Sequence, residues 1–432
     1  MTAKRGTLRL VLVAIALFTF GCGGPTLVQS PNLYTQGGEH PFDDVPERFQ
    51  NNRVDLIFAT DRKPIEKEDE EDGETRYGFG RSQSLAIGTC TVTIGDDLPW
   101  QDLVEASITE KRKKKLPLAV VDIQELVRFP RSSTDLSEKD GKYFEATAYV
   151  EAREQARVQA MQLIEQRLET SEKKEVYVFV HGYNNDFDAA AFRMAQLWHF
   201  MGRDGVPIMY TWPAGHGGLR GYNYDRESSE FTIFHLKQFL KGIASAPGLE
   251  KIHIIAHSRG TDVAITTLRE LNLEFRGTGI DIRDRLKIGS LVLAAPDLDW
   301  EVAQQRMTAE HLIIDVPDHA TFYLSGEDKA IGIAGWLFGS VQRIGRLGKE
   351  DLTEEQVVAM NEWKSGEAID VRLDTGFIGH GYFIDNPAVL SDLILLLRDG
   401  RKAGEEHGRP LHREQSGFWQ LLSGYPGQME DE

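Results

Sequence analysis

The sequence has 432 residues, and its 49 Lys and Arg against 67 Asp and Glu give a formal net charge of −18 at pH 7. A chain this acidic lacks the excess of basic residues that binding to phosphate backbones requires, so we exclude nucleic acid as a partner. The same charge disfavours broad electrostatic adhesion to anionic lipid. The length is sufficient for one α/β domain with insertions.

The first 21 residues have the pattern of an export signal. Basic residues between positions 4 and 9 precede an apolar run at 10–20, which is shorter than the roughly 20 residues that a membrane span needs. Gly21-Cys22 resembles the cleavage site of bacterial lipoproteins, in which the cysteine becomes the acylated first residue. We therefore predict a signal peptide at 1–21, lipidation of Cys22 and a lipid-anchored location in the bacterial cell envelope. A disulfide between Cys22 and Cys90 is the alternative.

Composition divides the rest of the chain into three parts. Residues 22–52 carry Pro, Gly, Asn and Gln without periodicity, and we predict a flexible tether. A folded domain is expected at 53–400, with an N-terminal extension before residue 175 and the core from 175 onward. Residues 401–432 are predicted to be a polar tail, in which only Phe418–Leu422 has the apolar pattern to pack.

The N-terminal extension contains three stretches typical of strands and one typical of a helix. The strands are predicted at 54–59, 84–94 and 119–129, where apolar and β-branched residues predominate. Apolar residues at helical spacing predict an amphipathic helix within 144–168.

From Glu175 onward, short apolar strands alternate with helical stretches, which predicts parallel strands joined by crossover helices. A helix is expected at 189–201, and the strands are expected at 176–180, 207–212, 252–256, 290–295, 321–324 and 369–373. Each strand ends in a polar or Gly-rich loop. Because ligands of open α/β sheets bind at the carboxyl ends of the strands, these loops should converge on one site.

The sequence Ala256-His257-Ser258-Arg259-Gly260 lies between a predicted strand and a predicted helix. It has the pattern of a nucleophile elbow, with Ala in place of the first Gly. A serine in such a tight turn needs small flanking residues, because the strand and the helix approach each other closely. We predict that Ser258 is a catalytic nucleophile.

A serine hydroxyl needs a histidine that accepts its proton and a carboxylate that orients the histidine. Ser258, Asp328 and His380 occur in the order Ser, Asp, His and follow three separate predicted strands. His380 is flanked by glycines that let its loop approach the serine. Asp297, which ends the preceding strand, is the alternative acid, with Glu327 and Asp299 as further competitors.

Two backbone N–H groups are expected to stabilise the oxyanion, one from Arg259 and one from the loop after strand 176–180, at Tyr183. His181 would brace that loop. A second interpretation of the same segment is a simple strand-to-helix turn with Asn184 or Asp186 as the helix N-cap. The two interpretations are compatible, because the catalytic one uses only the backbone.

Several motifs together resemble one known family. They are FATDR at 58–62, HGYN at 181–184, YTWPA at 210–214, AHSRG at 256–260, LAAPDLD at 293–299, FYLSGEDKA at 322–330 and GHGYF at 379–383. This set is similar to the alpha/beta hydrolases of the DUF900 family, over about residues 54–398. The resemblance implies an α/β-hydrolase fold, in which helices flank a mostly parallel sheet with added N-terminal strands. It also implies a serine hydrolase with esterase-like or lipase-like activity.

Three classes of function follow. The first is a carboxylic ester hydrolase that forms an acyl-Ser258 intermediate on a small-molecule or lipid ester. The second is another acyl-transfer enzyme with the same triad, such as a peptidase, thioesterase or acyltransferase, and the third is a non-catalytic envelope lipoprotein. No metal site and no cofactor are expected, because no zinc, P-loop or dinucleotide motif is found. The Gly-rich, apolar stretch 331–347 is either a lid or a packing helix, and loop 215–224 is a second candidate for shaping the pocket.

Overall fold

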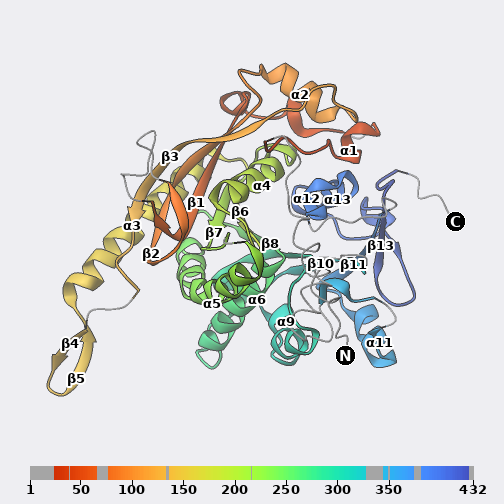
Figure 1. Ribbon diagram of the computed structural model, residues 1–432. Coiled ribbons are helices and arrows are strands. Elements are labelled where there is room, and N and C mark those ends of the chain that lie inside the picture. Colours follow the sequence, from red (N-terminus) through yellow and green to blue (C-terminus); the bar gives the residue numbers. More distant parts are fainter. Residues whose placement is uncertain are drawn as a thin grey trace, which may run out of the picture.

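The computed structural model describes residues 24–37, 39–65, 76–132, 136–215, 217–326, 344–348, 351–373 and 381–427. In this part of the chain one sheet of 11 strands forms the centre of the molecule, with the order β12-β13-β11-β10-β9-β8-β6-β7-β1-β2-β3. The remaining two strands form a separate hairpin (Figure 1).

Six parallel strands form the middle of the sheet: β6 (Glu175–Val180), β7 (Val206–Thr211), β8 (Lys251–His257), β9 (Ile288–Ala294), β10 (His319–Leu324) and β11 (Gly366–Arg372). Most of their residues are buried on both faces of the sheet, as the continuous apolar runs predict. Each agrees with a predicted strand to within a few residues. The predicted fold class, a mostly parallel sheet flanked by helices, is confirmed.

The N-terminal extension continues the same sheet. It contributes β1 (Arg53–Pro64), β2 (Tyr77–Ile94) and β3 (Leu118–Arg128). Strand β1 pairs in parallel with β7 and antiparallel with β2. The small hairpin of β4 (Leu136–Lys139) and β5 (Lys142–Glu145) projects from the body of the molecule at the start of α3 (Figure 1).

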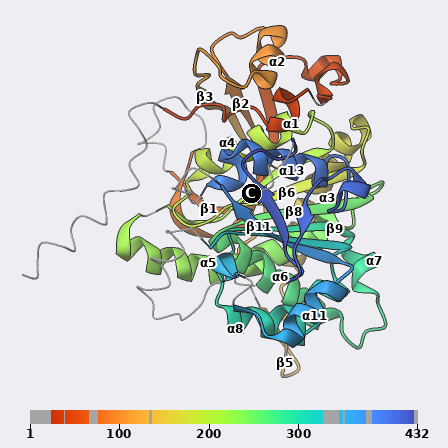
Figure 2. The same cartoon turned by 90° about the vertical axis from the view of Figure 1, so that its right-hand side faces the viewer.

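Helices cover both faces of the sheet. The α-helices are α1 (Asn32–Thr35), α2 (Trp100–Ile108), α3 (Thr147–Thr170), α4 (Phe187–Phe200), α5 (Gly218–Ile243), α6 (Arg259–Phe275), α7 (Ile282–Leu286), α8 (Trp300–Ala303), α9 (Leu312–Asp315), α11 (Glu354–Glu362), α12 (Tyr382–Asp385) and α13 (Pro387–Leu397). Single turns and short irregular elements are η1 (Pro41–Asp43), η2 (Glu47–Phe49), η4 (Gln304–Ala309), η5 (Ile344–Arg346) and η7 (Glu405–His407). One apolar core joins α4, α12 and α13 to the sheet, and a second joins α3, α5 and α6 to it. Figure 2 shows α13 and α6 on opposite sides of the strands.

The prediction of a flexible tether at 22–52 is wrong for the described residues 24–37 and 39–52. The side chains of Leu27, Tyr34 and Phe42 are buried in the core, and the Leu27 N–H donates a hydrogen bond to the Leu116 carbonyl. Because these apolar residues occur at irregular spacing, no helix or strand period revealed them.

The prediction of a polar tail from residue 401 is likewise wrong up to residue 427, except that Phe418–Leu422 packs on the fold as its apolar pattern indicated. Strand β13 (Trp419–Leu422) pairs in parallel with β11, and β12 (His412–Arg413) pairs with β13. Arg409 is fully buried and forms ion pairs with Glu367 and Asp392. The polar composition of this segment suggested a solvated tail, but the charge of Arg409 is buried and paired with two carboxylates inside the fold.

Several predicted features lie outside the described residues. They are the signal peptide at 1–21, Cys22, most of the lid candidate 331–347, and the triad members Asp328 and His380. In the described part of the chain Cys90 is a buried, free cysteine, and no helix there is long and apolar enough to cross a membrane. Most of the segment 215–224, expected as a loop, belongs to α5, which begins at Gly218.

Candidate active site

Ser258 is the single residue between the end of β8 and the start of α6, and its backbone has φ 52° and ψ −125°. A residue with a side chain rarely adopts positive φ, and such strain persists only where the surroundings hold it in place. Here the Ser258 N–H donates to the Ala294 carbonyl at 2.9 Å. The Ser258 carbonyl accepts hydrogen bonds from the N–H groups of Thr261 (3.0 Å) and Asp297 (3.3 Å). The elbow is therefore fixed on both sides of the serine.

Gly260 permits the close contact between α6 and the end of β6. A Cβ atom at this position would lie 2.4 Å from the His181 carbonyl oxygen and 2.5 Å from that of Val180. Both neighbours are backbone atoms that cannot move away independently. The requirement for a small residue at this end of the elbow, inferred from the sequence, is confirmed.

The loop after β6 passes directly beside the serine. A Cβ atom at Gly182 would lie 2.6 Å from the Ser258 Cβ atom and 3.2 Å from its Oγ atom. The next residues turn away, because Asn184 has φ 54° and its N–H donates to Asp225 Oδ2 at 3.0 Å. The loop then enters α4, where the Asp186 side chain accepts the Ala189 N–H as an N-cap. The N-cap interpretation of this segment is confirmed for Asp186.

His181 braces this loop as expected. Its Nε2 atom accepts the Trp212 N–H at 3.0 Å, and its Nδ1 atom lies 2.9 Å from the Gly182 carbonyl. Burial, and then the nearby charge of Arg62, lower the pKa of His181 to about 3. Because the Nε2 lone pair is already used and the ring stays neutral, His181 is unsuited to act as the general base.

This shift predicts a pH dependence of stability. Folded protein keeps His181 neutral down to about pH 3, whereas the unfolded chain binds a proton below about pH 6.5. The unfolded state therefore holds more protons between these values, and the free energy of unfolding falls as the pH is lowered through them. In His181→Gln this fall should be shallower by up to about 1.4 kcal/mol per pH unit. Urea denaturation at pH 7, 6 and 5 measures the slope.

The matched control for this prediction is His412→Gln, because the His412 side chain is exposed. This variant should keep the slope of the wild type. Equal slopes for His181→Gln and the wild type would show that His181 is protonated in the folded protein.

Among the candidate acids, the structure places Asp297 at the elbow. Asp297, which follows β9, is buried, and its backbone contacts the Ser258 carbonyl. Asp328 and His380 both lie outside the described residues: one described segment ends at Gly326, two residues before Asp328, and another begins at Gly381, directly after His380. Phe383 in α12 stacks on His257, the neighbour of Ser258, with ring centroids 4.4 Å apart. The segment that follows His380 therefore packs against the elbow.

Two buried charged residues at this site were not singled out from the sequence as functional. Arg62, in β1, and Asp225, in α5, both contact the loop after β6. Arg62 belongs to the FATDR motif, so the motif did mark the segment, although nothing in the sequence indicated that the guanidinium is buried. Among the residues that the structure describes, no cluster of three or more His, Cys, Asp or Glu could hold a metal ion.

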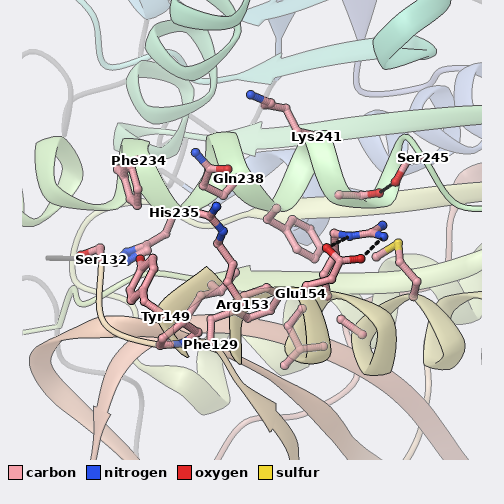
Figure 3. Close-up of a pocket in the computed structure, with 18 of the residues that line it drawn as sticks. Phe129, Ser132, Tyr149, Arg153, Glu154, Phe234, His235, Gln238, Lys241 and Ser245 are labelled. Carbon is pink, nitrogen blue, oxygen red and sulfur yellow. Dashed lines mark hydrogen bonds and ion pairs between the residues drawn. The ribbon is translucent and has the colours of Figure 1, made fainter. Parts of the chain in front are cut away.

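A cavity of about 610 Å³ lies elsewhere, between α3 and α5 (Figure 3). Apolar side chains such as Phe129, Met161 and Phe239 line it, and none of the predicted catalytic residues does. His235, also in its wall, forms a buried 2.9 Å contact between its Nδ1 atom and Asp61 Oδ2. This contact joins α5 to β1.

A parallel sheet with a strained serine at a strand-to-helix junction defines an α/β protein whose turn at Ser258 has the geometry expected of a nucleophile elbow. Residues 156–398 match the family described as alpha/beta hydrolase of unknown function (DUF900), and the chain belongs to this family. A search of curated proteins found no match.

Solved structures with some likeness include three hydrolase-related proteins. They are a predicted CIB-like hydrolase from Thermoplasma acidophilum (14% identity, 53% of this chain and 89% of that chain, TM-score 0.29), a lipase-esterase related protein from Clostridium acetobutylicum (10%, 52% and 94%, TM-score 0.28) and an esterase from Pyrobaculum calidifontis (12%, 53% and 78%, TM-score 0.27). At these identities and TM-scores, the activities of the three proteins do not transfer to this chain. The family assignment depends on the sequence match.

Proposed function

We propose that this protein is a serine hydrolase that cleaves carboxylic esters through an acyl-Ser258 intermediate. The observation that carries the proposal is the backbone of Ser258, held at φ 52° and ψ −125° between β8 and α6. A strained residue at the carboxyl edge of a parallel sheet is typical of a reactive site rather than of a stabilising one.

The proposed reaction has two steps. His380 takes the proton of Ser258 as Oγ attacks the ester carbonyl carbon, and the protonated histidine then gives that proton to the departing alcohol. Water, deprotonated by His380, attacks the acyl group, and the carboxylic acid leaves as Ser258 regains its proton. The position of Phe383 against His257 supports His380 as the base, because it brings the adjoining segment to the elbow.

The N–H groups of Arg259 and Tyr183 are proposed to bind the oxyanion in both steps. Arg259 is the first residue of α6, so its N–H lies at the positive end of the helix dipole. In the loop after β6, the Asn184 N–H already donates to Asp225. Tyr183 stands between that residue and Gly182, which contacts the serine.

The experiment that tests this function compares p-nitrophenyl esters with the matching p-nitroanilides. We expect ester turnover that exceeds anilide turnover by at least about 100-fold, because the better leaving group needs less protonation. Comparable turnover of the anilide would indicate a peptidase instead. Absence of turnover of every ester would favour the non-catalytic alternative.

The same ester assay assigns the acid of the triad. Asp328→Asn is expected to lower kcat by about 10⁴-fold, because an amide stabilises the wrong histidine tautomer. Asp297→Asn is the matched control and should lower kcat by less than about 10-fold. The reverse ranking would assign the acid to Asp297, whose backbone contacts the elbow directly.

A further inference from the structure

Two loops meet beside Ser258, and buried charges connect them. We call residues 181–185, after β6, the oxyanion loop, and residues 212–215, after β7, the neighbouring loop. Arg62 is fully buried between them. Its Nη2 atom donates to the Asn185 carbonyl at 2.7 Å, and its Nη1 atom donates to the Ala214 carbonyl at 2.8 Å.

Asp225 connects the same two loops through their N–H groups. Its Oδ2 atom accepts the Asn184 N–H at 3.0 Å and the Gly215 N–H at 3.3 Å. Arg62 therefore binds carbonyl groups at 185 and 214, while Asp225 binds amide groups at 184 and 215. In each loop the two charged side chains bind adjacent residues, 184 and 185 in the oxyanion loop and 214 and 215 in the neighbouring loop.

The other contacts of Arg62 are also with uncharged groups. Its side chain donates to Thr211 Oγ1 at 2.8 Å and to the Gly78 carbonyl at 3.3 Å, and it lies 3.3 Å from His181 Nε2. Within the described residues none of its hydrogen bonds goes to a carboxylate.

Burial lowers the pKa of Arg62 to about 10, although the carboxylates of Asp186, Asp61 and Asp225 attract the guanidinium. Burying the charge is thus costly, and an apolar residue of similar size would fill such a site at lower cost. Stability alone therefore does not explain why a charged residue occupies position 62.

We propose that Arg62 and Asp225 are positioning residues that hold the oxyanion loop against Ser258. They act through the backbone of Gly182 and Tyr183, which lies between Ser258 and the residues that the two charges bind. This inference rests on the proposed function, because it gives these residues a role in aligning the proposed oxyanion donors. A displacement of about 1 Å in such donors is enough to slow a reaction about 100-fold.

The first test compares variants of Asp225 in the ester assay. Asp225→Asn keeps an oxygen that accepts N–H groups, so its kcat should stay within about fivefold of the wild type. Asp225→Leu should lower kcat by at least about 100-fold and leave KM within about threefold, because the oxyanion exists only in the transition state. Its affinity for a trifluoromethyl ketone, which forms a tetrahedral oxyanion with the serine, should fall by the same factor as kcat.

The second test uses a matched pair of buried arginines. Arg203 is also buried and also donates to backbone carbonyls. Its partners are the carbonyls of Phe49, Asn51 and Arg53, which belong to neither of the two loops. Arg62→Met and Arg203→Met should both lower Tm, but only Arg62→Met should lower kcat of the folded protein by at least about 100-fold. Equal effects on kcat would overturn the positioning role.

Hydrogen exchange tests the inference independently of catalysis. In Asp225→Leu and Arg62→Met the amides of Asn184 and Gly215 should exchange at least about 10-fold faster, with no such change in Arg203→Met. Unchanged exchange would overturn the inference even if the wild type hydrolyses esters. Faster exchange in a protein without ester turnover would support the connection between the loops and contradict only the proposed function.

Discussion

Ser258→Ala is expected to lower kcat for ester hydrolysis by about 10⁴-fold to 10⁶-fold, because it removes the oxygen on which the proposed acyl intermediate forms. The substitution removes one oxygen atom from a buried residue whose backbone hydrogen bonds remain. The fold should therefore be kept, and circular dichroism with thermal unfolding checks this. The rates of purified wild type and variant with p-nitrophenyl butyrate measure the effect.

Ser245→Ala is the control for this substitution. Ser245 follows α5, its hydroxyl donates to the Gly242 carbonyl three residues earlier, and it lies in the wall of the separate cavity. Its kcat should equal that of the wild type. A Ser258→Ala variant that keeps more than about one tenth of the wild-type kcat would show that the nucleophile is another residue.

Gly182→Ala is expected to lower kcat by about 10²-fold to 10³-fold, the range found when an oxyanion donor is lost or displaced. The new Cβ atom would lie 2.6 Å from the Ser258 Cβ atom, so the oxyanion loop or the serine must move. KM should change little, because the proposed oxyanion donors would bind the transition state more tightly than the substrate. Initial rates over a range of ester concentrations separate the two parameters.

Gly242→Ala in α5 is the matched control, because a Cβ atom there would meet only the Met161 Cε atom at 3.8 Å. Replacing a helical glycine with alanine at an open position should stabilise the protein by up to about 1 kcal/mol and leave kcat unchanged. If both alanine variants retain full activity, the loop after β6 does not contribute the oxyanion donors.

The central strands and the elbow could be predicted because their signals are local. Apolar runs such as Val176–Val180 correspond directly to buried parallel strands, and the pattern around Ser258 specifies a tight turn. The need for a small residue at Gly260 could be inferred for the same reason. Which atoms Gly260 and Gly182 approach could not, because each glycine contacts a different strand end or turn from its own.

The contacts that hold the site together could not be predicted, because they join distant parts of the chain. Arg62 and Asp225 are separated by 163 positions and carry no periodic signal. The same applies to Arg409, whose ion pair with Glu367 anchors the C-terminal segment in the sheet. A charged residue in a sequence normally indicates a solvated surface, and only tertiary structure shows that these charges are buried and bound.

Covalent labelling with a fluorophosphonate, followed by peptide mass mapping, tests most directly whether Ser258 is an activated nucleophile. We expect one adduct per chain, on the peptide that contains Ser258, and no adduct in Ser258→Ala or in His380→Ala. An unlabelled wild-type protein, or an adduct on a different residue with Ser258 unmodified, would contradict this expectation.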